Sequence, residues 1–155
     1  MGYNVIDLID KAIKVSIRKK EIYKSIGKEN CDIPSIQIMS KVISKEIDKT
    51  IKYYETLKVE IGDVEFEEID LYIYDKMSFL IDEFNKRVYV TKINNVKEYL
   101  KFSLELEKDV QSLLIDVQGR FVKSTSDLHT KTYEILTFMI NNKAQNIATL
   151  EKTLK

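Results

Sequence analysis

The sequence contains very few residues that would interrupt a helix. It has 4 glycines and 1 proline among its 155 residues, whereas average usage is roughly 7% glycine and 5% proline. Because helix interiors tolerate these two residues least, we expect long helices joined by a few turns. The length suits one domain with a substantial core. The sequence therefore predicts a single all-α domain that spans residues 1–155.

Apolar side chains recur at spacings of three, four and seven residues, which is the pattern of helices with one buried face. We expect helices at about 4–26, 34–59, 66–87, 95–119 and 127–154. Asn4 suits the N-cap of the first helix, and Pro34 suits the first turn of the second. Gly27 lies where the first helix is expected to end. The run 88–91 looks strand-like but has no partner strand, so we interpret it as an extended connection.

Charge and composition exclude several classes of partner. The 25 basic and 25 acidic side chains balance, so the chain has no long-range field to attract nucleic acid or an anionic membrane. No apolar run approaches the roughly 18 residues of a membrane span, and the N-terminus lacks a signal-peptide pattern. The single cysteine, Cys31, cannot form an internal disulfide, which fits a reducing compartment. We expect a cytoplasmic protein without a nucleic-acid or membrane partner.

The polar residues outside the helical stripes offer no convincing catalytic site. Ser124, Thr125 and Ser126 lie near His129, but helix capping explains them better than nucleophilic catalysis does. The acidic residues of 64–70 suit a first helical turn, where the helix dipole favours negative charge. The sequence has no glycine-rich phosphate loop and no metal-spaced cysteine pair. It therefore predicts no catalytic and no cofactor-binding residues.

One stretch, residues 103–114, predicts a core helix with a carboxylate on its buried face. It reads Ser-Leu-Glu-Leu-Glu-Lys-Asp-Val-Gln-Ser-Leu-Leu, and its central acid is Glu107. Residues 12–23 look like a degraded copy, with Ser16 at the position of Glu107 and Tyr23 seven residues further on. The two stretches resemble the first and third helices of rubrerythrin-like members of the ferritin-like superfamily. Those helices carry a metal-binding glutamate seven residues before a tyrosine, which is Leu114 in the second stretch here.

The resemblance implies a ferritin-like four-helix bundle with an additional helix, 66–87, in the crossover between the second and third bundle helices. In that family the second and fourth helices each supply Glu-x-x-His, so six side chains meet around two metal ions. The corresponding vestigial ligand slots in this chain are Ser16, Ile47, Thr50, Glu107, Lys143 and Asn146. A shift of one residue would place Glu46 and Lys49 in the second helix's slots, but it would bury two charges within an apolar stripe. The only histidine, His129, belongs to no Glu-x-x-His motif, so we expect no metal and no cofactor.

These departures favour a degenerate ferritin-like bundle without di-metal chemistry, acting as an interaction or structural protein and not as an enzyme. Two alternatives stay open. One is a rubrerythrin-like di-metal oxidoreductase with unconventional ligands, and the other is an unrelated helical interaction module. Metal analysis separates the oxidoreductase from the rest. The burial of Glu107 separates the degenerate bundle from an unrelated module, in which this residue would be a surface charge.

Because the six slots converge in the family, Glu107 and Lys143 are expected to form a buried ion pair. Ser16, Thr50 and Asn146 would then hydrogen-bond that pair, since an isolated buried carboxylate is costly. Several aromatic residues lie outside the core stripes, namely Tyr53, Tyr72, Tyr74, Phe79 and Tyr89. They suggest an apolar surface that a second copy of the chain covers. We therefore predict a homodimer, and an unidentified protein partner is an alternative.

Overall fold

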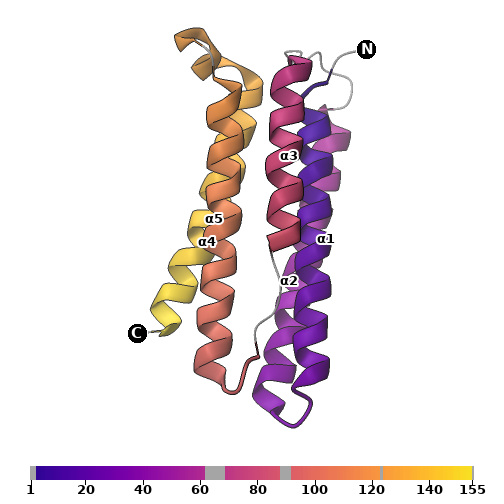
Figure 1. Ribbon diagram of the computed structural model, residues 1–155, viewed down its shortest axis with the longest axis vertical. Coiled ribbons are helices and arrows are strands. Elements are labelled where there is room, and N and C mark those ends of the chain that lie inside the picture. The colour runs from indigo at the N-terminus through magenta and orange to yellow at the C-terminus, as the bar shows by residue number, and fades with distance from the viewer. Residues whose placement is uncertain (1–2, 62–68, 88–91, 123, 155) are drawn as a thin grey trace.

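The computed structural model describes residues 3–61, 69–87, 92–122 and 124–154, and these residues form an all-α fold (Figure 1). The elements are α1 (Val5–Glu29), α2 (Pro34–Ile61), α3 (Leu71–Arg87), α4 (Val96–Phe121), the short 3₁₀ helix η1 (Thr125–His129) and α5 (Lys131–Leu154). The all-α prediction is confirmed. The strand-like run 88–91 lies outside the described residues.

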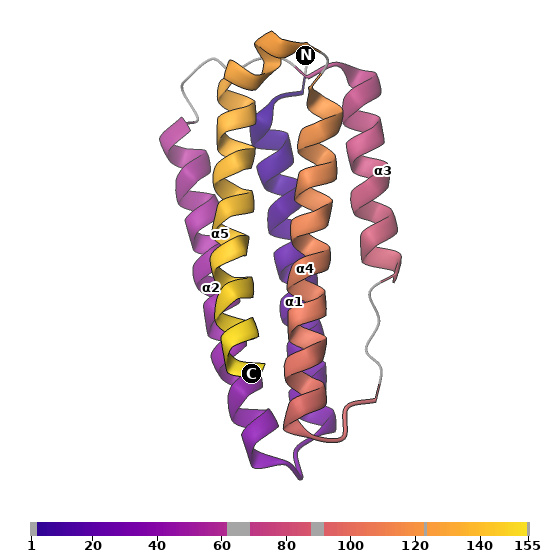
Figure 2. The ribbon, with the colours of Figure 1, turned by 90° about the vertical axis from the view of Figure 1, so that its left-hand side faces the viewer.

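The helices form two antiparallel hairpins that are joined by α3. Helix α1 pairs with α2, and α4 pairs with α5, and the closest packing lies within each of these hairpins. Helix α3 lies against α1 and α4 and brings the chain back along the bundle, so that α2 and α4 run in the same direction (Figures 1 and 2). None of the described helices is both long and apolar enough to cross a lipid bilayer.

Local capping explains where α1 begins and ends. The Asn4 side chain accepts a hydrogen bond from the Ile6 N–H at 2.8 Å, and the Asp7 carboxylate accepts one from the Asn4 N–H at 2.8 Å. This reciprocal capping box satisfies free N–H groups of the first turn. At the other end the Asn30 backbone and side-chain N–H groups both donate to the Ile26 carbonyl, at 3.0 and 2.9 Å.

Helix α1 continues past Gly27 to Glu29, so this glycine lies inside the helix and not at its end. Its backbone φ is not in the left-handed region. A Cβ at Gly27 would lie 3.1 Å from the Cβ of Ser40 in α2. The glycine therefore permits a close approach of α1 and α2 and does not terminate the helix. Ser40 itself donates a hydrogen bond to the Tyr99 hydroxyl of α4 at 3.2 Å, which links the two hairpins.

Helix α3 begins later than the expected residue 66. Residues 66–68 lie outside the described residues, but Ile69 and Asp70 are described and are not helical. The Ile69 N–H donates to the Tyr3 carbonyl at 2.6 Å, which holds the residue in an extended bridge. The Asp70 carboxylate accepts from the Tyr72 N–H at 2.8 Å, as an N-cap does. These two contacts set the start of the helix at Leu71.

Helix α5 also begins later than expected, at Lys131 instead of 127. The Ser124 N–H donates to the Asp127 carboxylate at 2.9 Å, and this contact closes the short helix η1. Thr130 then adopts an extended backbone, with φ −78° and ψ 156°. Its hydroxyl accepts from the Tyr133 N–H at 3.2 Å, so Thr130 caps the new helix. The capping residues thus divide one expected helix into two.

Aromatic side chains fill much of the core. The rings of Tyr23 and Tyr99 meet edge to face with their centroids 6.1 Å apart, and Phe102 packs against Tyr23 in the same way at 6.2 Å. Tyr23 and Tyr99 are almost completely buried. Because α1 carries the first of these rings and α4 carries the other two, the aromatic cluster joins the two hairpins.

Candidate functional site

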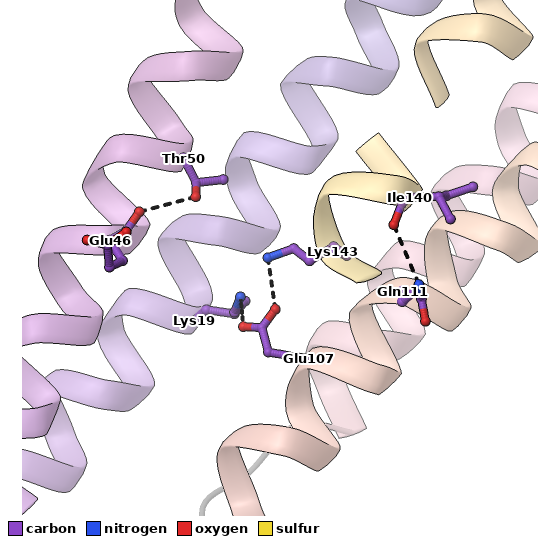
Figure 3. A network of polar contacts seen from close by, with 7 residues as sticks. All are labelled: Lys19, Glu46, Thr50, Glu107, Gln111, Ile140 and Lys143. Carbon is purple, nitrogen blue, oxygen red and sulfur yellow. Dashed lines mark hydrogen bonds and ion pairs between the residues drawn. The ribbon is translucent and has the colours of Figure 1, made fainter. Parts of the chain in front are cut away.

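A carboxylate lies inside the bundle between two lysines from other helices. Glu107 of α4 is 7% exposed, and Lys143 of α5 donates from Nζ to its Oε2 at 2.9 Å. Lys19 of α1 donates from Nζ to the other oxygen, Oε1. The two lysines are 5% and 3% exposed. Figure 3 shows Lys19 and Lys143 each reaching one of the two oxygens of Glu107, and we call these three residues the Lys-Glu-Lys cluster.

The structure brings Glu107 and Lys143 together, and it adds Lys19, which the sequence analysis did not select. Lys19 was overlooked because lysines are rarely buried. The internal repeat contained a signal for it. When residues 12–23 are aligned with 103–114, Lys19 corresponds to Val110, which has an inward-facing position in α4. An inward-facing lysine one turn from Ser16 could therefore have been expected.

The remaining slots do not supply the hydrogen bonds expected for the pair. Ser16 is buried, but it borders a small apolar cavity beside the cluster. The Thr50 hydroxyl donates to the Glu46 carbonyl of its own helix at 3.2 Å, and Asn146 is exposed. Glu107 instead accepts from two ammonium groups. The second lysine therefore takes the role that was expected of neutral polar groups.

Helix α2 turns Ile47 into the bundle and Glu46 and Lys49 toward solvent. Ile47 is buried with 5% exposure, whereas Glu46 and Lys49 are exposed and form an ion pair with each other at 3.1 Å. The shifted alignment would have pointed these two charges into the bundle. Exposed pairs of this kind contribute little to stability, so their interaction does not determine how α2 is oriented. The orientation of α2 is determined by its apolar stripe.

The cluster shifts the pKa values of its three members. Burial alone would raise the pKa of Glu107, but the two ammonium groups outweigh burial and lower it to about 2. Burial lowers the pKa of Lys19 to about 8, and the attraction of Glu107 only partly offsets burial and the repulsion from Lys143. For Lys143 the attraction of Glu107 outweighs burial, and its pKa is raised. At pH 7 the cluster thus holds two positive charges and one negative charge.

The neighbouring phenols do not neutralise the surplus positive charge. Burial and the nearby Glu107 raise the pKa of the Tyr23 hydroxyl far above its ordinary value. Burial likewise raises the pKa of Tyr54, although Lys143 opposes this shift. Both side chains are therefore uncharged near neutral pH. The Lys-Glu-Lys cluster and its neighbouring phenols therefore carry a net charge of +1 near neutral pH.

A cleft between α2 and α5 leads from the surface to the cluster. Its volume is about 520 Å³, and Lys19, Glu107 and Lys143 are among the residues that line it. Helix α2 contributes Thr50 and Tyr53 to the walls, and α5 contributes asparagine and threonine side chains. A separate cavity of about 30 Å³ also borders both lysines, and it is large enough for about two water molecules.

The residues do not fit a di-metal centre. Both oxygens of Glu107 accept hydrogen bonds from ammonium groups, and a protonated lysine would repel a metal cation. Carboxylate and imidazole ligands suit iron and manganese in a di-metal site. Within the part of the chain that the structure describes, no three His, Cys, Asp or Glu residues are grouped so that they could hold a metal ion.

Two other residues considered from sequence lie away from the cluster. Cys31 is exposed in the turn between α1 and α2. His129 is exposed at the end of η1, where Ser124 and Asp127 make capping contacts. Neither residue borders the cleft. Comparison of the chain with known protein families, curated proteins and solved structures finds no match.

Proposed function

We propose that the protein is a degenerate ferritin-like bundle that has lost di-metal chemistry and acts as an interaction or structural protein. The observation that carries this proposal is the position of Glu107. It is buried where three helices meet, and each of its two carboxylate oxygens accepts a hydrogen bond from a lysine ammonium group. In a di-metal protein the cations at such a carboxylate are metal ions. Here the chain supplies the cations itself.

The arrangement of the helices supports the same proposal. Ferritin-like bundles consist of two hairpins joined by one long crossover connection. The described helices follow this order, with α3 in the crossover (Figure 2). The burial of Glu107 favours this proposal over an unrelated helical module, in which a surface charge was expected. The two lysines favour it over an oxidoreductase with unconventional ligands, because they hold positive charge where metal ions would bind.

We also propose that the protein forms a homodimer through the outer face of α3. Leu71, Tyr72 and Phe79 are 59%, 67% and 61% exposed on this helix. Of the other aromatic residues considered from sequence, Tyr74 stacks on Tyr3 with ring centroids 3.8 Å apart. Tyr53 contacts Tyr54 and Phe138. Tyr89 lies outside the described residues.

Metal content and oligomeric state, measured on the same preparation, test the proposal. After growth in medium supplemented with iron, manganese and zinc, elemental analysis should find no stoichiometric metal. About two transition-metal atoms per chain that survive dialysis would instead support the oxidoreductase. Light scattering should give a mass of about twice 18.2 kDa. A monomer at every concentration would contradict the dimer without affecting the proposed loss of metal chemistry.

A further inference from the structure

The cleft between α2 and α5 carries more positive than negative charge. Its positively charged lining residues are Lys19, Lys49 and Lys143, and its negatively charged lining residues are Glu46 and Glu107. The Glu46 and Lys49 side chains pair with each other at the exposed rim. The surplus positive charge therefore lies at the buried end of the cleft. Buried charges are normally compensated by a partner, because the interior solvates them poorly.

The buried end of the cleft also offers hydrogen-bond donors. A protonated lysine has three N–H groups, and Glu107 accepts one from Lys19 and one from Lys143. Each lysine thus has further donors beyond the bond to Glu107. Ser103 borders the same cleft and is 1% exposed, and its hydroxyl lies beside that of Tyr23 without a hydrogen bond of standard geometry among the described residues. All three residues thus bring hydrogen-bond donors to the same cleft.

The outer part of the cleft has mixed walls that suit a small organic molecule. Ile43, Ile47, Tyr53 and Leu150 are apolar, whereas Thr50, Asn142, Asn146 and Thr149 are neutral polar residues beside the Glu46–Lys49 pair. The volume of about 520 Å³ lies within the usual range of pockets for small molecules. A dianion would exceed the single surplus charge and would be repelled by Glu107.

We propose that this cleft binds a small organic monocarboxylate, with the carboxylate at the Lys19 and Lys143 ammonium groups and the apolar part toward the opening. The bound carboxylate supplies the negative charge that the cluster lacks, and Ser103 donates a further hydrogen bond. The inference does not depend on a ferritin-like origin. Metal analysis and carboxylate binding are separate measurements, so either proposal can fail without the other.

Benzoate and butyrate are suitable probes for the intact chain, by calorimetry and by amide chemical-shift mapping in a low-chloride buffer at pH 7. Both carboxylates should bind saturably, and the largest shifts should lie in α2 and α5 beside the cleft. Benzamide has the same ring without the charge, and benzylamine has the opposite charge. Neither should bind. Phosphate tests whether any anion suffices, and it should bind more weakly than benzoate.

One variant tests the charge directly. Lys19→Met removes the surplus charge and should weaken benzoate binding at least about tenfold. The control is Lys20→Met, because Lys20 is the next residue of α1 but pairs with Asp48 at 2.5 Å outside the cleft. It should leave the affinity unchanged.

Circular dichroism shows whether each variant folds, and the ligand series on the natural chain decides the proposal if a variant does not. Absence of saturable benzoate and butyrate binding would overturn the proposal. Equal binding of benzamide, or binding of phosphate tighter than that of benzoate, would also overturn it. The same holds if Lys19→Met folds and binds benzoate as well as the natural chain does.

Discussion

Removing the three charges of the Lys-Glu-Lys cluster one at a time should reveal that it is a triad and not a pair. Glu107→Leu leaves two buried ammonium groups beside each other. The folded chain can avoid this repulsion by deprotonating one lysine, whose ordinary pKa is 10.5. At about 1.4 kcal/mol per pH unit, keeping a lysine deprotonated costs about 5 kcal/mol at pH 7. We therefore expect Glu107→Leu to lower the free energy of unfolding by about 3–5 kcal/mol.

Lys19→Met should have a much smaller effect. The pKa of Lys19, about 8 in the folded chain, already includes its attraction to Glu107, so burial and the repulsion from Lys143 outweigh that attraction. Removing Lys19 therefore loses no net electrostatic stabilisation, and Glu107 keeps Lys143 as its partner. The free energy of unfolding should fall by no more than about 1 kcal/mol.

Multiple variants separate the triad from a simple pair. Glu107→Leu combined with Lys143→Met would restore stability if only those two residues interacted. In the observed arrangement this double variant leaves Lys19 buried and unpaired, so it should still lose about 3 kcal/mol. Adding Lys19→Met removes the last charge and should bring stability to within about 1 kcal/mol of the natural chain.

Urea unfolding at pH 7, followed by circular dichroism, measures these differences, provided that the m-value is unchanged. Lys20→Met is the control, because the pair that Lys20 forms with Asp48 is partly exposed, and it should change stability by less than about 0.5 kcal/mol. The reasoning is refuted if Lys19→Met is as destabilising as Glu107→Leu. It is also refuted if the double variant recovers without the third substitution.

The pKa of Lys19 is about 8 in the folded chain and 10.5 ordinarily, so the unfolded chain binds more protons than the folded chain between these pH values. The stability of the natural chain relative to Lys19→Met should therefore rise as the pH increases through that window, by up to about 3 kcal/mol. Urea titrations at several pH values measure this difference. The pKa of Glu107 is lowered to about 2 from 4.5, so its stabilising contribution is present above pH 4.5. The extra stability of the natural chain over Glu107→Gln should therefore disappear as the pH falls toward 2. A stability difference that does not change with pH would contradict the assigned charges. Gly119 lies inside α4, and a Cβ added there would meet no other described part of the chain within 4 Å, so Gly119→Ala should stabilise the fold by about 0.5–1 kcal/mol. Gly27→Val should instead destabilise it by about 1–3 kcal/mol, because the added atoms meet Ser40; thermal unfolding of the two glycine variants, with opposite shifts expected, checks both.

The predicted helix positions were close where local sequence determines them. Pro34 begins α2 as expected, and Asn4 caps α1. The predictions failed where capping interrupts a continuous apolar pattern, as Asp70 does before α3 and Thr130 does before α5. Gly27 was misplaced for another reason. Its role depends on the distance between two helices, which a glycine in a sequence does not reveal.

The site was only partly predictable for a similar reason. The repeat and the apolar stripes placed Glu107 and Lys143 on inward faces, and their helices carry them there. Burial of Lys19 depends on a carboxylate from a distant helix, which compensates a charge that would otherwise turn outward. The cleft depends on the spacing between α2 and α5. Periodicity within one helix carries no information about that spacing.

The Lys-Glu-Lys cluster also bears on how the chain avoids misassembly. Leucine and isoleucine side chains can exchange neighbours when one helix slides along another by a turn, about 5.4 Å, so an apolar seam discriminates weakly between such arrangements. A slide of α1 or α5 would instead leave a lysine and a carboxylate oxygen buried without each other. That penalty falls on the competing arrangements and not on the native one. Replacing the whole triad with apolar residues should therefore yield a chain that is as stable but less uniquely folded.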